Sequence, residues 1–241
     1  MKKIIPLYIL MYAISPIAVA SYPWLSTLDP VIDYIEGGER LMNLQYGLHP
    51  LEETNNEEKI LLIGVHGAQS RGYEWVYPLT SLDNNKTLTH FYRWDNNACY
   101  QSSAVKLNAA IKSLVKERVN IKKIVILGHS YGGILLTWFL ENWSHHLPIE
   151  IHTVASPLAG MESINYACNY KTPKTIINNV RSVQWRTKKE FDNVFKNLMY
   201  DPQIINLTSH EVQNLPTQYK GKRLGHNWSI SYVADKIIFL E

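Results

Sequence analysis

One serine in this chain has the neighbours that nucleophilic catalysis requires. The segment Gly128-His129-Ser130-Tyr131-Gly132 has the spacing Gly-x-Ser-x-Gly and lies between an apolar run and an apolar helical pattern. A sharp turn from strand to helix strains the serine backbone, and small residues two positions before and after it let the strand and helix approach each other. Such a turn exposes the hydroxyl, which can then attack an electrophilic carbon. We therefore predict that Ser130 is a nucleophile; the alternative is an ordinary turn.

Two backbone N–H groups near this serine could stabilise a negatively charged oxygen. Tyr131 stands at the expected start of a helix, where N–H groups have no partner within the helix. The other group follows an earlier apolar run, in Val65-His66-Gly67-Ala68. Because the His-Gly pair lets the backbone come close to a substrate, we predict an oxyanion hole made by the N–H groups of Ala68 and Tyr131. His66 and His129 are expected to hold the loops by hydrogen bonds.

The base that activates the serine should be a histidine that follows it, since proteins with this turn carry serine, acid and histidine in that order. The candidates are His145, His146, His152, His210 and His226. The first two end a helical pattern, the third lies inside an expected strand, and the fourth precedes a short strand. His226 lies in a Gly-His-Asn loop between the last expected strand and the last helix. We predict His226 as the general base.

The acid that orients this histidine is less sharply defined by the sequence. Glu190 and Asp192 follow the strand expected at 180–186, and Asp201 lies further along. A carboxylate just past that strand would orient the imidazole and stabilise its cation. We predict Asp192 in this role and keep Asp201 and Glu190 as alternatives. All three could instead be exposed carboxylates at helix starts.

The elements that would position these residues alternate along the chain. Apolar runs predict strands at 59–65, 88–94, 121–127, 148–155, 180–186 and 211–215, and helical patterns cover 101–118, 132–143 and 227–239. Strands without apolar–polar alternation are buried on both faces. The pattern therefore predicts a doubly wound, mostly parallel α/β sheet with helices on both faces. Residues 21–58 are less regular and could hold a leading antiparallel hairpin.

The first twenty residues differ from the rest. Lys2 and Lys3 precede an uncharged apolar stretch that ends in Ala18-Val19-Ala20. This pattern is typical of a secretory signal peptide, and the stretch is at the short end of what a bilayer-crossing helix needs. We predict a signal peptide at 1–20, one domain at 21–241, and a periplasmic or secreted product. An uncleaved membrane anchor is the alternative.

Charge and motifs narrow the classes of function. Removing the two N-terminal lysines lowers the formal net charge from +3 to about +1, which leaves no basic field that would favour nucleic acid. The sequence has neither a metal-ligand cluster nor a glycine-rich phosphate loop. We therefore predict no metal, no cofactor and no nucleic-acid partner.

Five segments carry a resemblance to a known family: HGAQSRGYEW, LGHSYGG, VASPLAG, WRTKKEFDNVF and RLGHNWSI. Over residues 58–241 the chain resembles the α/β-hydrolase superfamily, and more narrowly its small exported bacterial members of lipase or esterase type, which lack a large cap domain. The resemblance implies an acyl-enzyme route, in which Ser130 attacks an ester carbonyl and His226 passes its proton to the leaving alcohol. It favours a small-molecule or lipid ester as substrate and is compatible with transient contact with a membrane surface.

Other functions stay open at this point. The same triad could cleave amides or thioesters, since the serine turn defines the nucleophile and not the leaving group, and a hydrolase-fold binding protein without chemistry is a further alternative. The insertion 157–180 is long enough for a partial lid.

The two cysteines of the chain are Cys99 and Cys168. Each follows a strand whose carboxyl end should lie at the same edge of a parallel sheet. In an oxidising compartment we predict a disulfide between them; two buried free thiols are the alternative.

Overall fold

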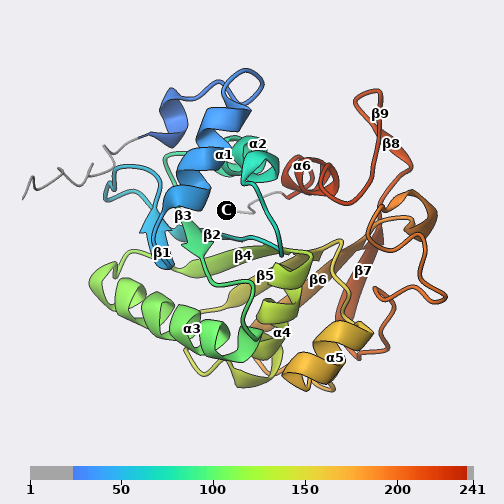
Figure 1. The fold of residues 1–241 in the computed structure, drawn as a ribbon. Coiled ribbons are helices and arrows are strands. Elements are labelled where there is room, and N and C mark those ends of the chain that lie inside the picture. Colours follow the sequence, from blue (N-terminus) through green and yellow to red (C-terminus); the bar gives the residue numbers. More distant parts are fainter. Residues whose placement is uncertain (1–23, 238–241) are drawn as a thin grey trace, which may run out of the picture.

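The structure, a computed structural model, describes residues 24–237 (Figure 1), so the predicted signal peptide at 1–20 lies outside the described residues. A seven-stranded sheet in the order β1-β3-β2-β4-β5-β6-β7 forms the central layer. Only β1 is antiparallel, to β3, and all the other neighbours pair in parallel. The strands are β1 (Gly47–Pro50), β2 (Ile60–Val65), β3 (Thr87–Arg93), β4 (Lys123–His129), β5 (Ile149–Val154), β6 (Val180–Arg186) and β7 (His210–Asn214).

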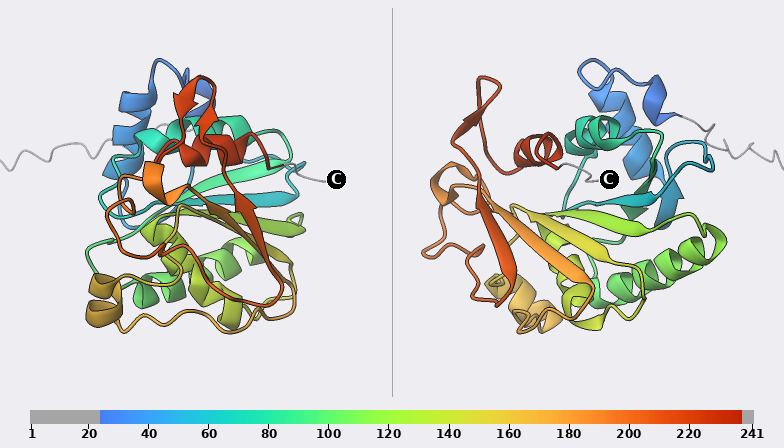
Figure 2. Two further views of the ribbon diagram at one scale, coloured as in Figure 1. Left: turned by 90° about the vertical axis from the view of Figure 1, so that its right-hand side faces the viewer. Right: turned by 180° about the vertical axis from the view of Figure 1, so that it is seen from behind.

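Helices cover both faces of this sheet (Figures 1 and 2). One face carries α3 (Tyr100–Glu117), α4 (Tyr131–Asn142) and α5 (Glu162–Cys168), and the other carries α1 (Tyr34–Asn43), α2 (Tyr73–Leu82) and α6 (Ser229–Ala234). Successive strand residues face opposite cores: Ile124 and Ile126 pack with α3 and α4, whereas Val125 and Leu127 pack with α2 and α6. Burial on both faces explains the continuous apolar runs. The predicted doubly wound α/β class is confirmed.

The register brings the strand ends that matter to one edge of the sheet. Val65 at the end of β2 lies opposite Gly128, and His129 lies opposite Val154 at the end of β5. β6 runs parallel to β5, so the loop after it emerges at the same edge. Loops from four neighbouring strands therefore meet where β4 ends.

Residues 24–58 differ from the expected antiparallel hairpin. They form a short 3-10 helix (Leu25–Thr27), α1, and the single strand β1, which pairs with β3. Gly37 and Gly38 interrupt the apolar pattern of α1 in the sequence, but they allow close packing: a Cβ on Gly38 would lie 2.6 Å from the backbone nitrogen of Tyr73 in α2. The hairpin prediction is wrong, because residues 34–43 form a helix and β1 pairs with β3 instead of with a second strand from this segment.

The C-terminal region also differs in detail. α6 covers Ser229–Ala234, so it begins two residues later and ends earlier than the predicted helix 227–239, whose last two residues lie outside the described residues. A two-stranded hairpin, β8 (Gln218–Tyr219) and β9 (Lys222–Arg223), precedes it and was not predicted. A second short 3-10 helix, η2 (Lys189–Phe191), follows β6.

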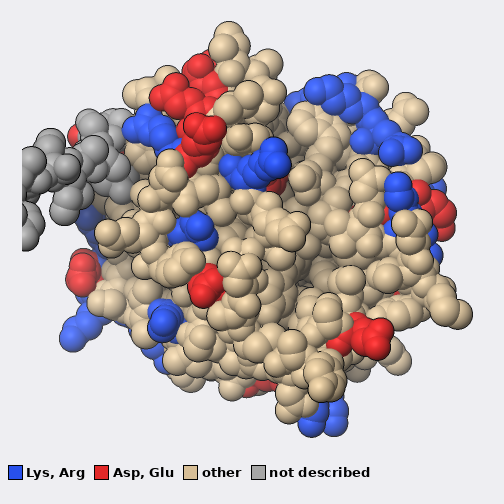
Figure 3. All heavy atoms as spheres, viewed as in Figure 1, with Lys and Arg blue, Asp and Glu red and all other residues tan. Residues whose placement is uncertain are grey.

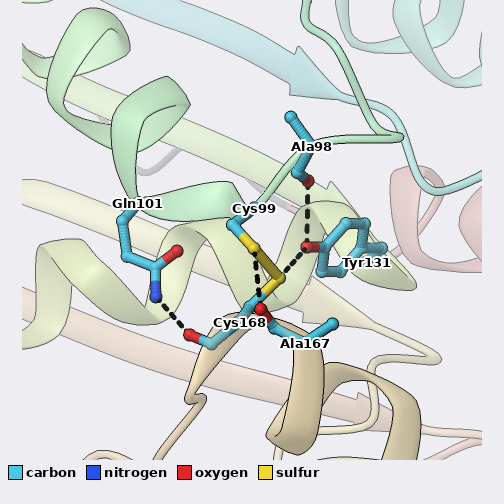
Figure 4. Close-up of a disulfide and its surroundings, with 6 residues drawn as sticks. All are labelled: Ala98, Cys99, Gln101, Tyr131, Ala167 and Cys168. Carbon is cyan, nitrogen blue, oxygen red and sulfur yellow. Dashed lines mark hydrogen bonds between the residues drawn. A yellow bond between two sulfur atoms is a disulfide. The ribbon is translucent and has the colours of Figure 1, made fainter.

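A disulfide joins Cys99, just before α3, to Cys168, the last residue of α5 (Figure 4). The predicted pairing is therefore present, with a Cα–Cα distance of 5.3 Å. Next to it, the Tyr131 hydroxyl donates to the carbonyl of Ala98 (3.2 Å), and Gln101 Nε2 donates to the carbonyl of Cys168 (2.7 Å). The insertion 157–180 is thus tied to α3.

Candidate active site

Ser130 occupies a strained turn between β4 and α4. Its φ of 51° and ψ of −118° lie in a backbone region that residues other than glycine rarely adopt. Its N–H donates to the carbonyl of Val154 at the end of β5 (2.9 Å), which anchors the turn. A Cβ on Gly132 would lie 2.3 Å from the carbonyl oxygen of Val65, so the glycine allows α4 to approach the end of β2. This is the steric role predicted for it.

His226 and Asp192 are joined by a hydrogen bond. His226 Nδ1 lies 2.9 Å from Asp192 Oδ2. An ionised carboxylate only accepts, so Nδ1 carries the hydrogen and Nε2 keeps its lone pair. The ring of Phe195 stands edge-on to the His226 ring at 5.2 Å. These contacts orient the imidazole.

Asp192 is fully buried and well supplied with donors. Oδ2 accepts a second bond from the Thr187 hydroxyl (2.7 Å), and Oδ1 accepts from the backbone N–H groups of Val194 (2.9 Å) and Phe195 (3.3 Å). Burial by itself raises the pKa of Asp192, but the bonds from His226, Thr187 and Val194 outweigh it and lower the pKa. The carboxylate is therefore ionised beside the imidazole.

The two alternative acids lie elsewhere. Asp201 Oδ1 accepts from the backbone N–H (3.0 Å) and Nε2 (3.1 Å) of Gln203. Glu190 is exposed in η2. Of the three candidates, only Asp192 contacts the imidazole of His226.

The other histidines after Ser130 have separate environments. His152 Nε2 lies 2.7 Å from Glu150, and its Nδ1 accepts from Trp185 Nε1 (3.0 Å). His210 Nδ1 lies 2.9 Å from the Ser182 hydroxyl. His145 Nδ1 accepts from the N–H of Leu147 (3.2 Å), and the His146 ring packs against His145. These contacts fit structural roles.

His66 and His129 support the loops around the site. His66 Nδ1 donates to the carbonyl of Gly67 (2.9 Å), and its Nε2 accepts from the N–H of Trp94 (3.3 Å). His129 Nε2 donates to the carbonyl of His226 (3.0 Å), and their rings lie 4.7 Å apart. Burial lowers the pKa of His66 to about 4 and that of His129 to about 3, so both are neutral near pH 7.

The two N–H groups expected to bind an oxyanion lie on either side of the serine. Tyr131 is the first residue of α4, and the N–H at that position has no acceptor within the helix. Ala68 follows Gly67, where a Cβ would lie 2.9 Å from the Cβ of Ser130. The loop after β2 is thus pressed against the turn, and the segments that carry both N–H groups adjoin Ser130.

Ser130 and His226 line one cavity of about 910 Å³. Its walls come from the start of α1, the loop after β2, α2, the β8–β9 hairpin and the start of α6, and no residue of the insertion 157–180 lines it. Sequence reasoning missed the wall residues Tyr34, Tyr73, Tyr77, Lys220 and Trp228. Tyr34, Tyr73, Tyr77 and Lys220 lie in segments where no helix or strand was predicted. Trp228 lies at the start of the predicted helix 227–239, but no motif marks it as a wall residue.

The remaining expectations concern metals and membranes. Between residues 24 and 237 no group of three or more His, Cys, Asp or Glu side chains could hold a metal ion. In the same range, none of the helices combines the length and apolar character of a bilayer crossing.

Comparisons with known proteins give the fold a name. No family model matches the chain. The proline iminopeptidase of Saccharolobus solfataricus is 29% identical over 126 residues, which cover 48% of this chain and 39% of that protein.

Two solved structures superpose with a TM-score of 0.50. MGS-M1, an α/β-hydrolase enzyme from a Medee basin deep-sea metagenome library, is 15% identical and covers 77% of this chain and 80% of its own. Aspergillus fumigatus lipase B is 14% identical and covers 70% of this chain and 47% of its own. The chain therefore has the α/β-hydrolase fold, as the resemblance implied.

Proposed function

We propose that this α/β-hydrolase-fold protein is a serine hydrolase that cleaves carboxylic esters, with Ser130 as nucleophile, His226 as general base and Asp192 as the acid that orients it. The observation that carries the proposal is the arrangement at one cavity. A strained serine lines it together with an imidazole whose Nδ1 is bonded to a buried carboxylate. This is the arrangement that nucleophilic acyl transfer needs.

The proposed reaction proceeds in two steps. His226 Nε2 takes the proton of the Ser130 hydroxyl while Oγ attacks the ester carbonyl, and the tetrahedral oxyanion is held by the N–H groups of Ala68 and Tyr131. His226 then gives the proton to the alcohol as it departs, and the acyl group remains on Ser130. Water, activated by the same imidazole, releases the acid. Asp192 holds Nδ1–H throughout and stabilises the transient imidazolium.

Cleavage of amide bonds is the second candidate, because the curated relative with 29% identity is a proline iminopeptidase. The fold alone does not separate the leaving groups, and a thioesterase or a binding protein without chemistry would use the same scaffold. The cavity favours esters of apolar acids through its aromatic walls, which include Tyr34, Tyr73 and Trp228.

The test compares 4-nitrophenyl acyl esters of increasing chain length with aminoacyl 4-nitroanilides, acyl thioesters and prolyl anilides. The proposal predicts the highest kcat/KM for an acyl ester and no turnover by Ser130→Ala. Faster hydrolysis of prolyl anilides would show that the protein is a peptidase and not an esterase. Absence of turnover on every substrate class would favour the binding protein.

We also propose that the protein is exported after cleavage near Ala20, to the periplasm or beyond. The Cys99–Cys168 disulfide supports this, since disulfides persist in oxidising compartments. N-terminal sequencing of the protein from fractionated cells tests it. The expected first residue is Ser21, and recovery of an intact N-terminus in the cytosol would refute export.

A further inference from the structure

We infer that the site recognises esters whose acyl or alcohol part carries a negative charge, and that Arg71 and Lys222 bind this charge. The inference rests on the function proposed above. Basic side chains outnumber acidic ones on the cavity wall, although the net charge of the chain without its first twenty residues is only about +1.

The charged side chains that line the cavity are Arg71, Lys220, Lys222 and Glu74. Lys220 is already paired, because its Nζ lies 2.9 Å from Asp235 Oδ2. Glu74 accepts a hydrogen bond from the Ser70 hydroxyl. Within residues 24–237, Arg71 and Lys222 have no acidic partner. Two cations thus face the cavity with free hydrogen-bonding capacity.

The wall that carries Lys222 is fixed in place. Lys220 Nζ donates to the Tyr77 hydroxyl (2.8 Å), which in turn donates to Asp235 Oδ1 (2.7 Å), so the β8–β9 hairpin is attached to α2 and to the end of α6. Lys222 Nζ lies 4.9 Å from the ring centroid of Trp228, which also lines the cavity. Figure 3 shows Lys and Arg side chains gathered over this hairpin at the upper right.

Arg71 reaches the same cavity from a second segment. It stands three residues after Ala68 in the loop that carries the proposed oxyanion N–H. The next residue, Gly72, has a φ of +80°, and a Cβ there would lie 2.3 Å from the carbonyl oxygen of Gly38. This end of the loop is therefore pressed against α1. The guanidinium is a planar fork that binds carboxylate or phosphate through two parallel bonds.

An anion in the cavity would find two cations that lack a carboxylate partner, whereas the one carboxylate on the wall, Glu74, already accepts from Ser70. The aromatic side chains of Tyr34, Tyr73 and Trp228 provide apolar contact for the rest of the substrate. Both a carboxylate and a phosphate could bind to these two cations. The substrates below carry a carboxylate on the acyl side of the ester or a phosphate on the alcohol side, so that the two cases can be distinguished.

The test uses matched pairs of substrates. For a charge on the acyl side, the pair is the 4-nitrophenyl monoester of suberic acid and the same compound with its free carboxylate methylated. For a charge on the alcohol side, the pair is 1-acylglycerol 3-phosphate and 1-acylglycerol of equal chain length. Each pair is assayed with the native protein, with Arg71→Gln/Lys222→Gln, and with Lys106→Gln/Lys116→Gln. The last variant removes two positive charges from α3, on the other face of the sheet, and serves as the charge-matched control.

We expect the native protein to prefer the charged member of one pair by about tenfold in kcat/KM, which equals about 1.4 kcal/mol. The preference should disappear in Arg71→Gln/Lys222→Gln and persist in the control. It should also shrink when ionic strength rises from about 0.01 M to about 1 M, which shortens the screening length from about 30 Å to about 3 Å.

The outcomes distinguish a failure of charge recognition from a failure of the proposed ester hydrolysis. Equal kcat/KM within both pairs, with neutral esters still hydrolysed, overturns the charge inference and leaves the ester hydrolase intact. A preference that survives in Arg71→Gln/Lys222→Gln also overturns it. Absence of hydrolysis of every ester overturns the proposed function and this inference with it. Thermal melting of each variant verifies that the fold is retained.

Discussion

Replacing Asp192 by Asn tests the proposed triad at the residue where the sequence left most doubt. In the native protein Oδ1 accepts two backbone N–H groups, and Oδ2 accepts from His226 Nδ1 and the Thr187 hydroxyl. An asparagine at this position keeps its single side-chain oxygen toward the two backbone N–H groups. In the flipped orientation its NH₂ group would face these N–H groups, and donors would face donors. Its NH₂ group then faces His226.

This exchange changes the tautomer of the imidazole. Nδ1 must become the acceptor, so the hydrogen moves to Nε2, which can no longer take the proton of Ser130. The Thr187 hydroxyl can adapt, since it can turn toward Gln203 Oε1 at 3.1 Å. We therefore expect kcat to fall by about 10⁴-fold, or about 5 kcal/mol in the barrier, while the fold is retained.

The assay is steady-state hydrolysis of a 4-nitrophenyl ester with circular dichroism as the check on folding. Asp201→Asn is the matched control, because Asp201 bonds Gln203 and does not contact His226. The control should keep its activity within a few-fold. Native-like activity in Asp192→Asn, or a large loss confined to Asp201→Asn, would refute the tautomer argument.

Three further predictions concern stability. A double alanine variant without the Cys99–Cys168 bond frees a loop with a sequence separation of 69, so the free energy of unfolding should fall by about 4 kcal/mol. Urea denaturation against the native oxidised protein measures this loss, and an unchanged midpoint would contradict it. His66 and His129 have folded-state pKa values of about 4 and about 3, below the value of 6.5 expected when unfolded, so the unfolded chain binds more protons as pH falls through 6.5. Each of them should contribute a loss of roughly 2 kcal/mol between pH 7 and pH 5, to which His90 and His210 add, since their pKa values are also lowered to about 4. A flat profile of urea melts over that range would be inconsistent with neutral burial. Gly132→Ala would place a methyl group 2.3 Å from the carbonyl oxygen of Val65 and should cost about 1–3 kcal/mol with a lower Tm, whereas native-like melting would show that α4 can shift.

Strands β2 to β7 and helices α3, α4 and α6 were predicted from the sequence, whereas β1, α1, α2 and α5 were not. The strand at 180–186 matches β6 in both bounds, and the ends of β2 through β5 were placed within two residues. Continuous apolar runs signal strands that are buried on both faces, and this signal is local. The Gly-x-Ser-x-Gly spacing is local as well, so the strained turn at Ser130 could be placed without knowledge of distant segments.

The walls of the cavity were not predictable in the same way. α2 contains Pro78 and follows Gly72, which hides its helical pattern, and the strands of the β8–β9 hairpin have two residues each. Their positions depend on contacts across the chain, such as Lys220 with Tyr77. Sequence alone also left Asp201 open as the acid. Which of the two carboxylates meets His226 depends on the course of the loop after β6, which is held by the bonds of Thr187 with Asp192 and Gln203.

Labelling with a fluorophosphonate probe, followed by mass spectrometry of the peptides, identifies the nucleophile directly. We expect one adduct per chain, located on Ser130, with labelling strongly slowed in His226→Ala and abolished in Ser130→Ala. Labelling of Ser130→Ala at the native rate, or an adduct on another residue of the native protein, would show that Ser130 is not the nucleophile.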